Sequence, residues 1–271
     1  MLYIVATPIG NLADITFRAV EVLGTCAYIL CEDTRHSLPL LTHYGIKKPL
    51  VSLHKFNESF REQKVVQDLK QGLSIALISD AGTPGISDPG SKLVQSCLEH
   101  KIRVVPIPGP SACIAALSCA GVEMDRFQFL GFLPKKASEL KQCLQEALSY
   151  PGSTVCFESP RRLIKTLELL QQLAPERLLA IARELTKLHE EVCRGTAEEL
   201  LAHWKEKQVK GELVLILSRE KEPAGVWEEL SIEEHLEQVQ RSYQLTRKEA
   251  VMLVAKLRGL KKRDVYNTAC T

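Results

Sequence analysis

Short apolar runs alternate with amphipathic stretches along the first part of the chain. One of the stretches, residues 57–70, places Val65, Val66 and Leu69 near one face and charged residues on the other, which is typical of a helix packed on one side. Apolar runs with the length of strands lie at residues 3–6, 28–31, 50–53, 74–79 and 103–107. Strands that alternate with helices predict an α/β fold.

A second series of strands and helices follows. Its predicted strands are residues 127–130, 154–157, 178–183, 191–194 and 212–217, and its predicted helices are 138–149, 160–173 and 196–205. The segment from Glu190 to Thr196 lies between two of these strands and indicates an antiparallel element. We therefore expect a mixed sheet in this half, with the junction between the halves near residues 108–121.

The pattern changes after Arg219. Lys221 to Gly225 has the composition of a linker. Two capping boxes follow, Ser231 with Glu234 and Thr246 with Glu249, and Gly259 separates the helical patterns 247–258 and 261–268. We expect two α/β domains, residues 1–112 and 113–220, and a helical tail, residues 221–271.

The net charge of +2 is unevenly distributed. Residues 241–271 hold eight Lys or Arg and two acidic residues, a net charge of +6, so the remaining chain carries −4. This split favours a basic appendage that contacts a polyanion, and the alternative is a solvated helix face.

The longest apolar runs fall short of the ~20 residues of a membrane-spanning helix, and the first residues lack a basic leader. We expect a cytoplasmic protein with no membrane segment.

Nine cysteines are spread singly along the chain, with no Cys-x-x-Cys pair. Most of them fall in apolar stretches, where a thiol behaves as a small hydrophobic group. We expect buried, reduced thiols and no metal site.

Three loops follow predicted strands or open a helix. The first, Ala6 to Leu12, contains only Gly10, so it lacks the three-glycine dinucleotide fingerprint and the Walker lysine loop; a plain strand-to-helix turn is the alternative. The second, residues 79–90, contains three glycines and two prolines, and its backbone can approach a ligand closely. In the third, Ser111 is placed to cap a helix, whose first N–H groups would suit a nucleotide-like ligand; a cap alone would also explain this serine.

These segments together resemble the tetrapyrrole methylase superfamily, in its branch that methylates a ribose 2'-hydroxyl of 16S ribosomal RNA. The resemblance runs in order through about residues 1–219, and the basic tail resembles the C-terminal helices of that branch. The motifs are Ala6-Thr7-Pro8-Ile9-Gly10-Asn11-Leu12, Glu32-Asp33-Thr34-Arg35, residues 79–90, residues 108–112, Gly131-Phe132-Leu133-Pro134, Phe157-Glu158-Ser159-Pro160-Arg161-Arg162 and Arg183-Glu184-Leu185-Thr186-Lys187.

The resemblance implies two α/β domains of the tetrapyrrole methylase type, with S-adenosyl-L-methionine in the cleft between them, and a homodimer. The implied cofactor-binding residues are Pro8, Thr83, Ile86, Ser111, Ala112, Phe157, Ala182 and Gly211. Many superfamily members read Gly-Asp-Pro where this chain reads Gly82-Thr83-Pro84, and Asp80 is the candidate for the missing carboxylate. The implied substrate is a cytidine of 16S rRNA, naked or in the small ribosomal subunit.

A ribose hydroxyl is a poor nucleophile, so a base or a nearby cation would assist methyl transfer. Glu184 is our candidate base and Lys187 the candidate cation; the alternative is that they form a structural ion-pair cluster with Arg183. Candidate substrate-binding residues are Glu32, Asp33, Arg35, His54, Asn57, Arg161 and Arg162.

Two other functions stay open at this point. A methylase of corrin or porphyrin precursors would share the fold and the cofactor, but it needs neither the basic tail nor the motif from Glu32 to Arg35. A non-catalytic RNA-binding assembly factor would need the tail, but has no reason to keep the loops at 79–90 and 108–112 intact.

Overall fold

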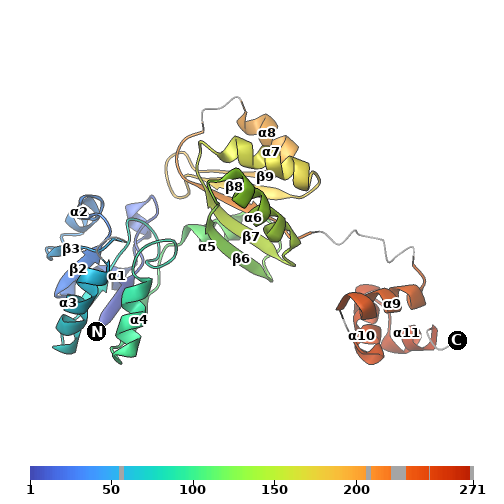
Figure 1. Cartoon of the computed structure of the whole chain (residues 1–271), viewed down its shortest axis with the longest axis horizontal. Coiled ribbons are helices and arrows are strands. Elements are labelled where there is room, and N and C mark those ends of the chain that lie inside the picture. The colour runs from blue at the N-terminus through green and yellow to red at the C-terminus, as the bar shows by residue number, and fades with distance from the viewer. Residues whose placement is uncertain (55–57, 206–208, 221–229, 244, 269–271) are drawn as a thin grey trace. The chain divides into compact units, whose positions relative to one another are not determined.

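The computed structural model describes residues 1–54, 58–205, 209–220, 230–243 and 245–268. The chain divides into two compact units, Met1–Arg219 and Glu220–Thr271. The first unit contains two five-stranded sheets, and in the second the described residues form helices and the turns that join them (Figure 1).

The first sheet is parallel throughout, with the strand order β3-β2-β4-β1-β5. Apolar residues of α1 and α2 form one core with the sheet, and apolar residues of α3 and α4 form another. The carboxyl ends of the strands therefore meet at one edge, which is where open α/β sheets bind ligands. The strands are β1 (Leu2–Val5), β2 (Tyr28–Cys31), β3 (Leu50–Ser52), β4 (Ile75–Leu77) and β5 (Val104–Ile107), and the helices are α1 (Phe17–Thr25), α2 (Thr34–His43), α3 (Glu58–Lys70) and α4 (Ser91–Glu99), with a short 3-10 turn at Leu12–Asp14.

The second sheet is mixed, with the order β6-β7-β10-β8-β9. β6 and β7 are parallel, whereas β10 runs antiparallel to β7 and β8, and β9 runs antiparallel to β8. One core contains α6, α7 and α8, and a separate core contains α5. The elements are α5 (Ala112–Cys119), β6 (Phe127–Phe132), α6 (Ala137–Ser149), β7 (Ser153–Glu158), α7 (Leu163–Leu173), β8 (Leu179–Arg183), β9 (Glu191–Gly195), α8 (Ala197–Trp204) and β10 (Leu213–Leu217).

The second unit contains α9 (Ile232–Tyr243), α10 (Arg247–Leu257) and α11 (Lys262–Thr268). Its own core is formed by Leu236, Val239, Ala250, Val251, Val254, Ala255 and Val265. Both predicted capping boxes form, because Glu234 accepts from the Ser231 N–H and Glu249 accepts from the Thr246 N–H. The Arg258 guanidinium also donates to the buried His235 and to the carbonyl of Leu230.

The predicted α/β class, the mixed sheet and the C-terminal helices are confirmed. The predicted linker at 221–225 lies outside the described residues. Five of the eight cysteines in the described part of the chain are buried, and burial raises the pKa of the Cys97 thiol to about 11. Within the described residues, no helix is both long enough and apolar enough to cross a membrane.

Candidate functional site

A cavity of about 420 Å³ lies within the first unit and is lined by residues from both sheets. The first sheet contributes residues that follow β1, β2 and β4, and the second contributes the carboxyl ends of β7 and β8. The amino end of β10 reaches the same edge because β10 is antiparallel, which pairs Leu213 with Glu158 and with Arg183. The volume falls in the range of ~300–1000 Å³ that small-molecule sites occupy.

The loop at residues 79–90 is held against the first loop. Thr7 and Gly82 exchange backbone hydrogen bonds of 2.9 and 3.0 Å, and the Thr83 hydroxyl donates to the carbonyl of Pro110 at 3.3 Å. Gly82 has a φ of 75°, in the left-handed region that glycine adopts without strain. The loop is thereby fixed with its backbone at the cavity wall, where Gly82, Thr83 and Ile86 line the space.

Ser111 occupies the N-cap position of α5, as predicted, but its side chain makes no cap hydrogen bond. A side-chain cap hydrogen bond therefore does not account for this serine. Ser111 and Ala112 instead line the cavity, together with Cys113 of the first helical turn. The start of α5, whose first N–H groups have no partner within the helix, thus faces the space where a ligand would lie.

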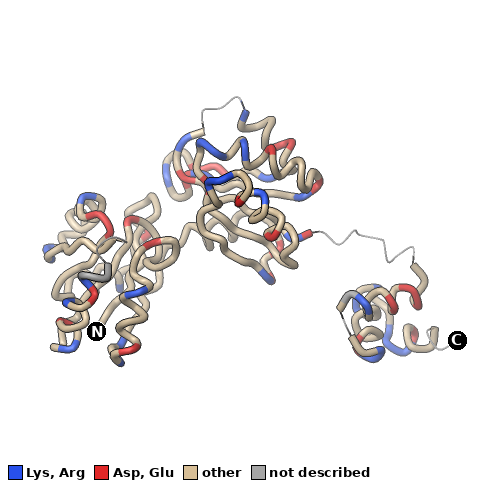
Figure 2. The backbone as a smooth tube through the Cα atoms, in the orientation of Figure 1, with Lys and Arg blue, Asp and Glu red and all other residues tan. Residues whose placement is uncertain are grey.

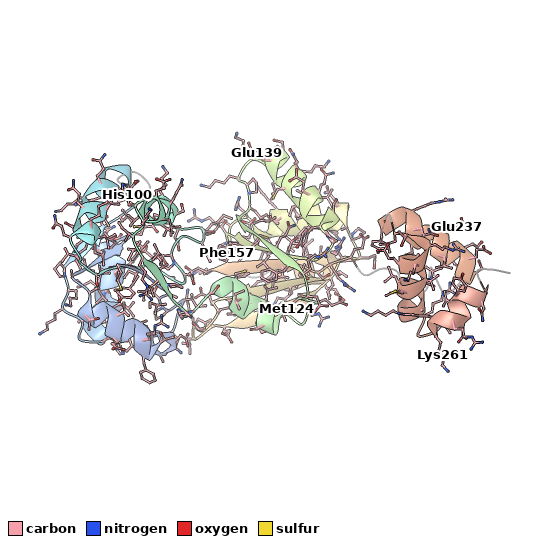
Figure 3. The ribbon with its side chains drawn as sticks, turned by 90° about the horizontal axis from the view of Figure 1, so that it is seen from below. His100, Met124, Glu139, Phe157, Glu237 and Lys261 are labelled. Atoms are coloured by element: carbon pink, nitrogen blue, oxygen red, sulfur yellow. The ribbon has the colours of Figure 1, made fainter. Side chains whose placement is uncertain are left out.

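The second sheet supplies an apolar wall. The ring of Phe157, labelled in Figure 3, makes a 5.0 Å edge contact with Phe129 and lies 5.2 Å from the ring of Phe132. Ala182 of β8 and Val214 of β10 lie on the same wall. Small and aromatic residues in this arrangement leave room for a flat ring.

Eight of the nine residues expected at the cofactor line this cavity: Asp80, Thr83, Ile86, Ser111, Ala112, Phe157, Ala182 and Gly211. Pro8 lines a second cavity, of about 280 Å³, which shares Ile9, Asp80, Ala81 and Glu212 with the first. Sequence reasoning missed Ile9, Glu158 and Ser159 on the first cavity and His36 on the second. Their positions in the loop after β1, at the end of β7 and in the first turn of α2 are the signals that could have identified them.

Glu184 and Lys187 form a compact ion-pair network. The Lys187 ammonium lies 2.9 Å from Glu184 and 3.0 Å from Glu212, and Glu184 also accepts from the Glu212 N–H at 2.9 Å. Burial acts to raise the pKa of Glu184, but the hydrogen bonds from Lys187 and Glu212 outweigh it and lower the pKa below its ordinary value. Burial acts to lower the pKa of Lys187, and its two carboxylate partners raise it above the ordinary value.

The backbone beside this network is unusual. Glu184 and Thr186 have φ values of 50° and 65°, in the left-handed region that residues with side chains rarely adopt. Such strain persists where the surroundings fix it, often at functional sites. Lys187 lines the second cavity, whereas Glu184 packs directly against Gly211, so a Cβ at Gly211 would overlap its carboxyl. Of the three residues in the alternative ion-pair cluster, Glu184 and Lys187 do pair, whereas Arg183 pairs with Glu191.

The residues expected to bind substrate are placed in different ways. Glu32 lines the first cavity. Asp33 caps α2 and is held by the Arg35 guanidinium, whose hydrogen bonds lower the pKa of Asp33 to about 2. Arg35 extends into solvent with 88 % of its side chain exposed. His54 is half-buried just after β3, and Asn57 lies outside the described residues.

Arg161 and Arg162 differ, although they are neighbours. Arg161 is exposed. Arg162 pairs with the buried Glu158 at 2.6 Å and donates to the carbonyls of Leu133 and Pro134. Its guanidinium is therefore engaged in holding the turn between β7 and α7, and this engagement does not fit the expected role of Arg162 in substrate binding.

Three potential metal ligands meet on β9 and α8. Nε2 of His203 lies 2.7 Å from Glu191 and 3.4 Å from the Cys193 sulfur. Arg183 holds the other oxygen of Glu191 at 3.2 Å. Hydrogen bonds and this ion pair account for the cluster, and none of the three ligands lines the first cavity.

Comparisons with known proteins agree with this architecture. The family model for the tetrapyrrole (corrin/porphyrin) methylases matches residues 1–201. A crystal structure of diphthine synthase covers 80 % of this chain and 89 % of its own, with a TM-score of 0.62 and 14 % identity. A uroporphyrin-III-C-methyltransferase from Thermus thermophilus covers 80 % and 94 %, with a TM-score of 0.56 and 19 % identity. At these identities the likeness concerns the fold.

Curated relatives are more similar. The ribosomal RNA small subunit methyltransferase I of Halalkalibacterium halodurans is 44 % identical over 98 % of this chain and 93 % of its own length. The protein of the same name from Haemophilus influenzae is 46 % identical over 98 % and 95 %. The chain belongs to the tetrapyrrole methylase family and, within it, to the group of the ribosomal RNA small subunit methyltransferases I.

Proposed function

We propose that this protein transfers a methyl group from S-adenosylmethionine to the ribose 2'-hydroxyl of a cytidine in 16S ribosomal RNA. The observation that carries the proposal is the extent of the match to the relatives. The methylase family model ends at residue 201, whereas the relatives named for ribosomal RNA align over 98 % of the chain and thus include the helical unit that starts at Glu220.

The first cavity fits S-adenosylmethionine in volume and in chemistry. The start of α5 and the Ser111 hydroxyl supply hydrogen-bonding groups, and Phe157, Ala182 and Val214 supply an apolar wall suited to an adenine ring. Glu32, Asp80 and Asp88 line the same space, and carboxylates suit a ligand that carries a sulfonium and an ammonium group. We assign the eight cavity residues expected from the sequence to cofactor binding, and Pro8 to the neighbouring wall.

S-adenosylmethionine supplies an electrophilic methyl group, so the protein mainly has to align the acceptor oxygen with it. The loop at 79–90 and the start of α5 hold the cofactor in the position that this alignment requires. Lys187 lines the second cavity and stays protonated, so it favours a developing alkoxide or holds a phosphate. Glu184 keeps Lys187 in position through its ion pair and packs against Gly211.

The proposed role of the basic residues on α10, on α11 and in the turn between them is contact with RNA. Lys248, Lys256, Lys261, Lys262 and Arg263 are exposed. None of these five cations forms an ion pair with a described residue. In Figure 3, Glu237 and Lys261 lie on opposite sides of the unit, and Figure 2 shows the acidic residues mainly on α9. One side of the unit is therefore suited to phosphate contact.

Two assays with the purified protein test the proposal. In calorimetry, S-adenosylmethionine and its demethylated product should both bind, and Thr83→Arg should abolish binding by filling the cavity. With labelled S-adenosylmethionine, label should pass to unmodified small ribosomal subunits or their RNA, and not to a porphyrin precursor. Transfer only to the tetrapyrrole would support the methylase alternative. Binding of RNA without any binding of S-adenosylmethionine would support the assembly factor.

A further inference from the structure

His36 and Asp80 come from separate segments and meet at the carboxyl edge of the first sheet. Asp80 follows β4, His36 lies in the first turn of α2, and α2 follows β2, the strand next to β4. Nδ1 of His36 lies 3.1 Å from Oδ2 of Asp80, and Oδ1 of Asp80 accepts the backbone N–H of Asp33 at 3.2 Å. Both carboxylate oxygens are thus engaged, which fixes the carboxylate against the ring.

This contact determines which nitrogen of His36 carries the proton. A carboxylate only accepts hydrogen bonds, so Nδ1 must be the donor. In the neutral ring, Nε2 then carries the lone pair, which is the tautomer that a general base requires. No hydrogen bond from Nε2 to a described residue accompanies the Nδ1 contact.

The pair lies where the two cavities meet. Asp80 lines both of them, and His36 lines the second, together with Lys187 and Glu212. The His36 side chain is 71 % exposed, so a group on a macromolecule can reach it. If S-adenosylmethionine occupies the first cavity, an acceptor in the second lies next to it.

His36 suits proton removal better than the carboxylate suggested by the sequence. Glu184 is held by Lys187 and the Glu212 N–H, and its lowered pKa makes it a weak base. The imidazole of histidine is the side chain that general acid–base catalysis uses most often. The charged groups around His36 are Asp33 and Arg35 at the start of its helix and Asp80, Lys187 and Glu212 from the segments facing it.

We propose that His36 is the general base of the methyl transfer and that Asp80 is its positioning residue, an inference that rests on the proposed function. The bond from the ribose oxygen to the methyl carbon forms as the methyl–sulfur bond breaks, with its electron pair remaining on sulfur. The hydroxyl proton passes to Nε2 and then to solvent. Asp80 stabilises the imidazolium that results.

The test uses His36→Gln and, as a matched control, His43→Gln, which changes an exposed histidine at the other end of α2. With saturating S-adenosylmethionine and small subunits, we expect kcat of His36→Gln to fall about a hundredfold or more at pH 7. Cofactor affinity in calorimetry should stay within threefold, and His43→Gln should match the unsubstituted protein. The fall of kcat toward acid pH should disappear in His36→Gln.

Asp80→Asn provides a second variant. An amide can donate to Nδ1, which moves the ring proton to Nε2, so kcat should fall although the size of the side chain is kept. A kcat of His36→Gln within threefold of that of the unsubstituted protein would overturn the inference, and so would an unchanged fall of kcat toward acid pH. In either case methylation by the unsubstituted protein would leave the proposed function intact. Absence of ribose methylation by the unsubstituted protein would instead refute the proposed function, and this inference with it.

Discussion

Gly10 is the residue at which the first loop touches the segment that carries Lys187. A Cβ at this position would lie 2.9 Å from the carbonyl oxygen of Leu185 and would also overlap the Lys187 side chain. The lysine can move aside, but the backbone carbonyl of Leu185 cannot move without shifting the turn that follows β8. A glycine at this position therefore allows close contact between the loop that follows β1 and the turn that follows β8.

We predict that Gly10→Ala destabilises the protein by about 1–3 kcal/mol, as overpacking of a tight contact does, and weakens binding of S-adenosylmethionine. Gly24→Ala is the matched control, because nothing lies within 4 Å of its added Cβ and the residue is helical. It should leave binding unchanged and stabilise the protein by up to about 1 kcal/mol. Denaturant unfolding and calorimetry measure both effects, and equal behaviour of the two variants would contradict the contact.

The lowered pKa of Glu184 predicts the direction in which the stability of the fold changes with pH. Its pKa in the folded protein lies below the ordinary ~4.3 of glutamate. The ionised carboxylate therefore favours the folded state; this contribution is complete above the ordinary pKa and is lost as pH falls through the lower folded value. We predict that Glu184→Gln lowers the Tm at pH 7 and reduces the loss of Tm between pH 5 and about pH 3. Parallel Tm curves for the two proteins would show that the pair with Lys187 does not stabilise the fold.

At the scale of elements, most strands and helices follow from the pattern of apolar residues. The strand predicted at 28–31 has the observed bounds of β2. The strand predicted at 74–79 is shorter, Ile75–Leu77, because Ser79 bonds to the turn that follows. The helix predicted from Pro160 begins at Leu163, since Arg162 bonds back to the carbonyls after β6.

The contacts between elements were harder to predict than the elements themselves. Asp80 and His36 are 44 positions apart, and they meet because β2 lies next to β4. The pattern of apolar residues predicts which face of a strand is buried, but it does not predict which strand lies next to it in the sheet. For the same reason, the partner of Lys187 across the site, Glu212, was not expected.

The start of α5 allows a test that separates binding from stability. Ser111 makes no cap hydrogen bond, whereas Thr196, at the start of α8, forms a complete capping box with Glu199. We predict that Ser111→Ala weakens binding of S-adenosylmethionine but barely changes the free energy of unfolding. Thr196→Ala should do the reverse, with a loss of about 1 kcal/mol of stability. A loss of stability in Ser111→Ala with unchanged binding would restore the serine to a purely structural role.

At the scale of the whole molecule, the basic C-terminal residues belong to a unit that is neutral overall. The excess of +6 over residues 241–271 is real, but the helical unit begins at Glu220. Residues 220–271 contain nine Lys or Arg and nine Asp or Glu, so the unit is neutral and residues 1–219 carry the net +2. Glu233, Glu234 and Glu237 lie on α9, whereas the basic residues that pair with no described residue lie on α10, on α11 and in the turn between them. Deleting the unit would change the net charge little. Substitution of the basic residues on α10, on α11 and between them is therefore a sharper test of RNA contact than deletion of the unit.

We predict that replacing Lys248, Lys256, Lys261, Lys262 and Arg263 by Gln weakens RNA binding and flattens its dependence on salt. Each lost phosphate contact should reduce the logarithmic salt slope by ~0.7–0.9. The control replaces five cations at the amino edge of the first sheet, away from the cavity: Lys47, Lys48, Lys70, Lys101 and Arg103. Cofactor binding should be unchanged in both variants. An equal loss of RNA affinity in the control would mean that general charge, and not the helical unit, holds the RNA.

The chemistry of the methylated product shows whether the methyl group reaches a ribose oxygen of a cytidine. Small ribosomal subunits without this modification are incubated with the protein and S-adenosylmethionine labelled in the methyl group, and the RNA is then hydrolysed in alkali. A 2'-O-methyl group removes the nucleophile for alkaline cleavage, so we expect label in an alkali-resistant dinucleotide that yields 2'-O-methylcytidine on enzymatic digestion. Label recovered in mononucleotides with a methylated base, or no label in the RNA at all, would contradict it.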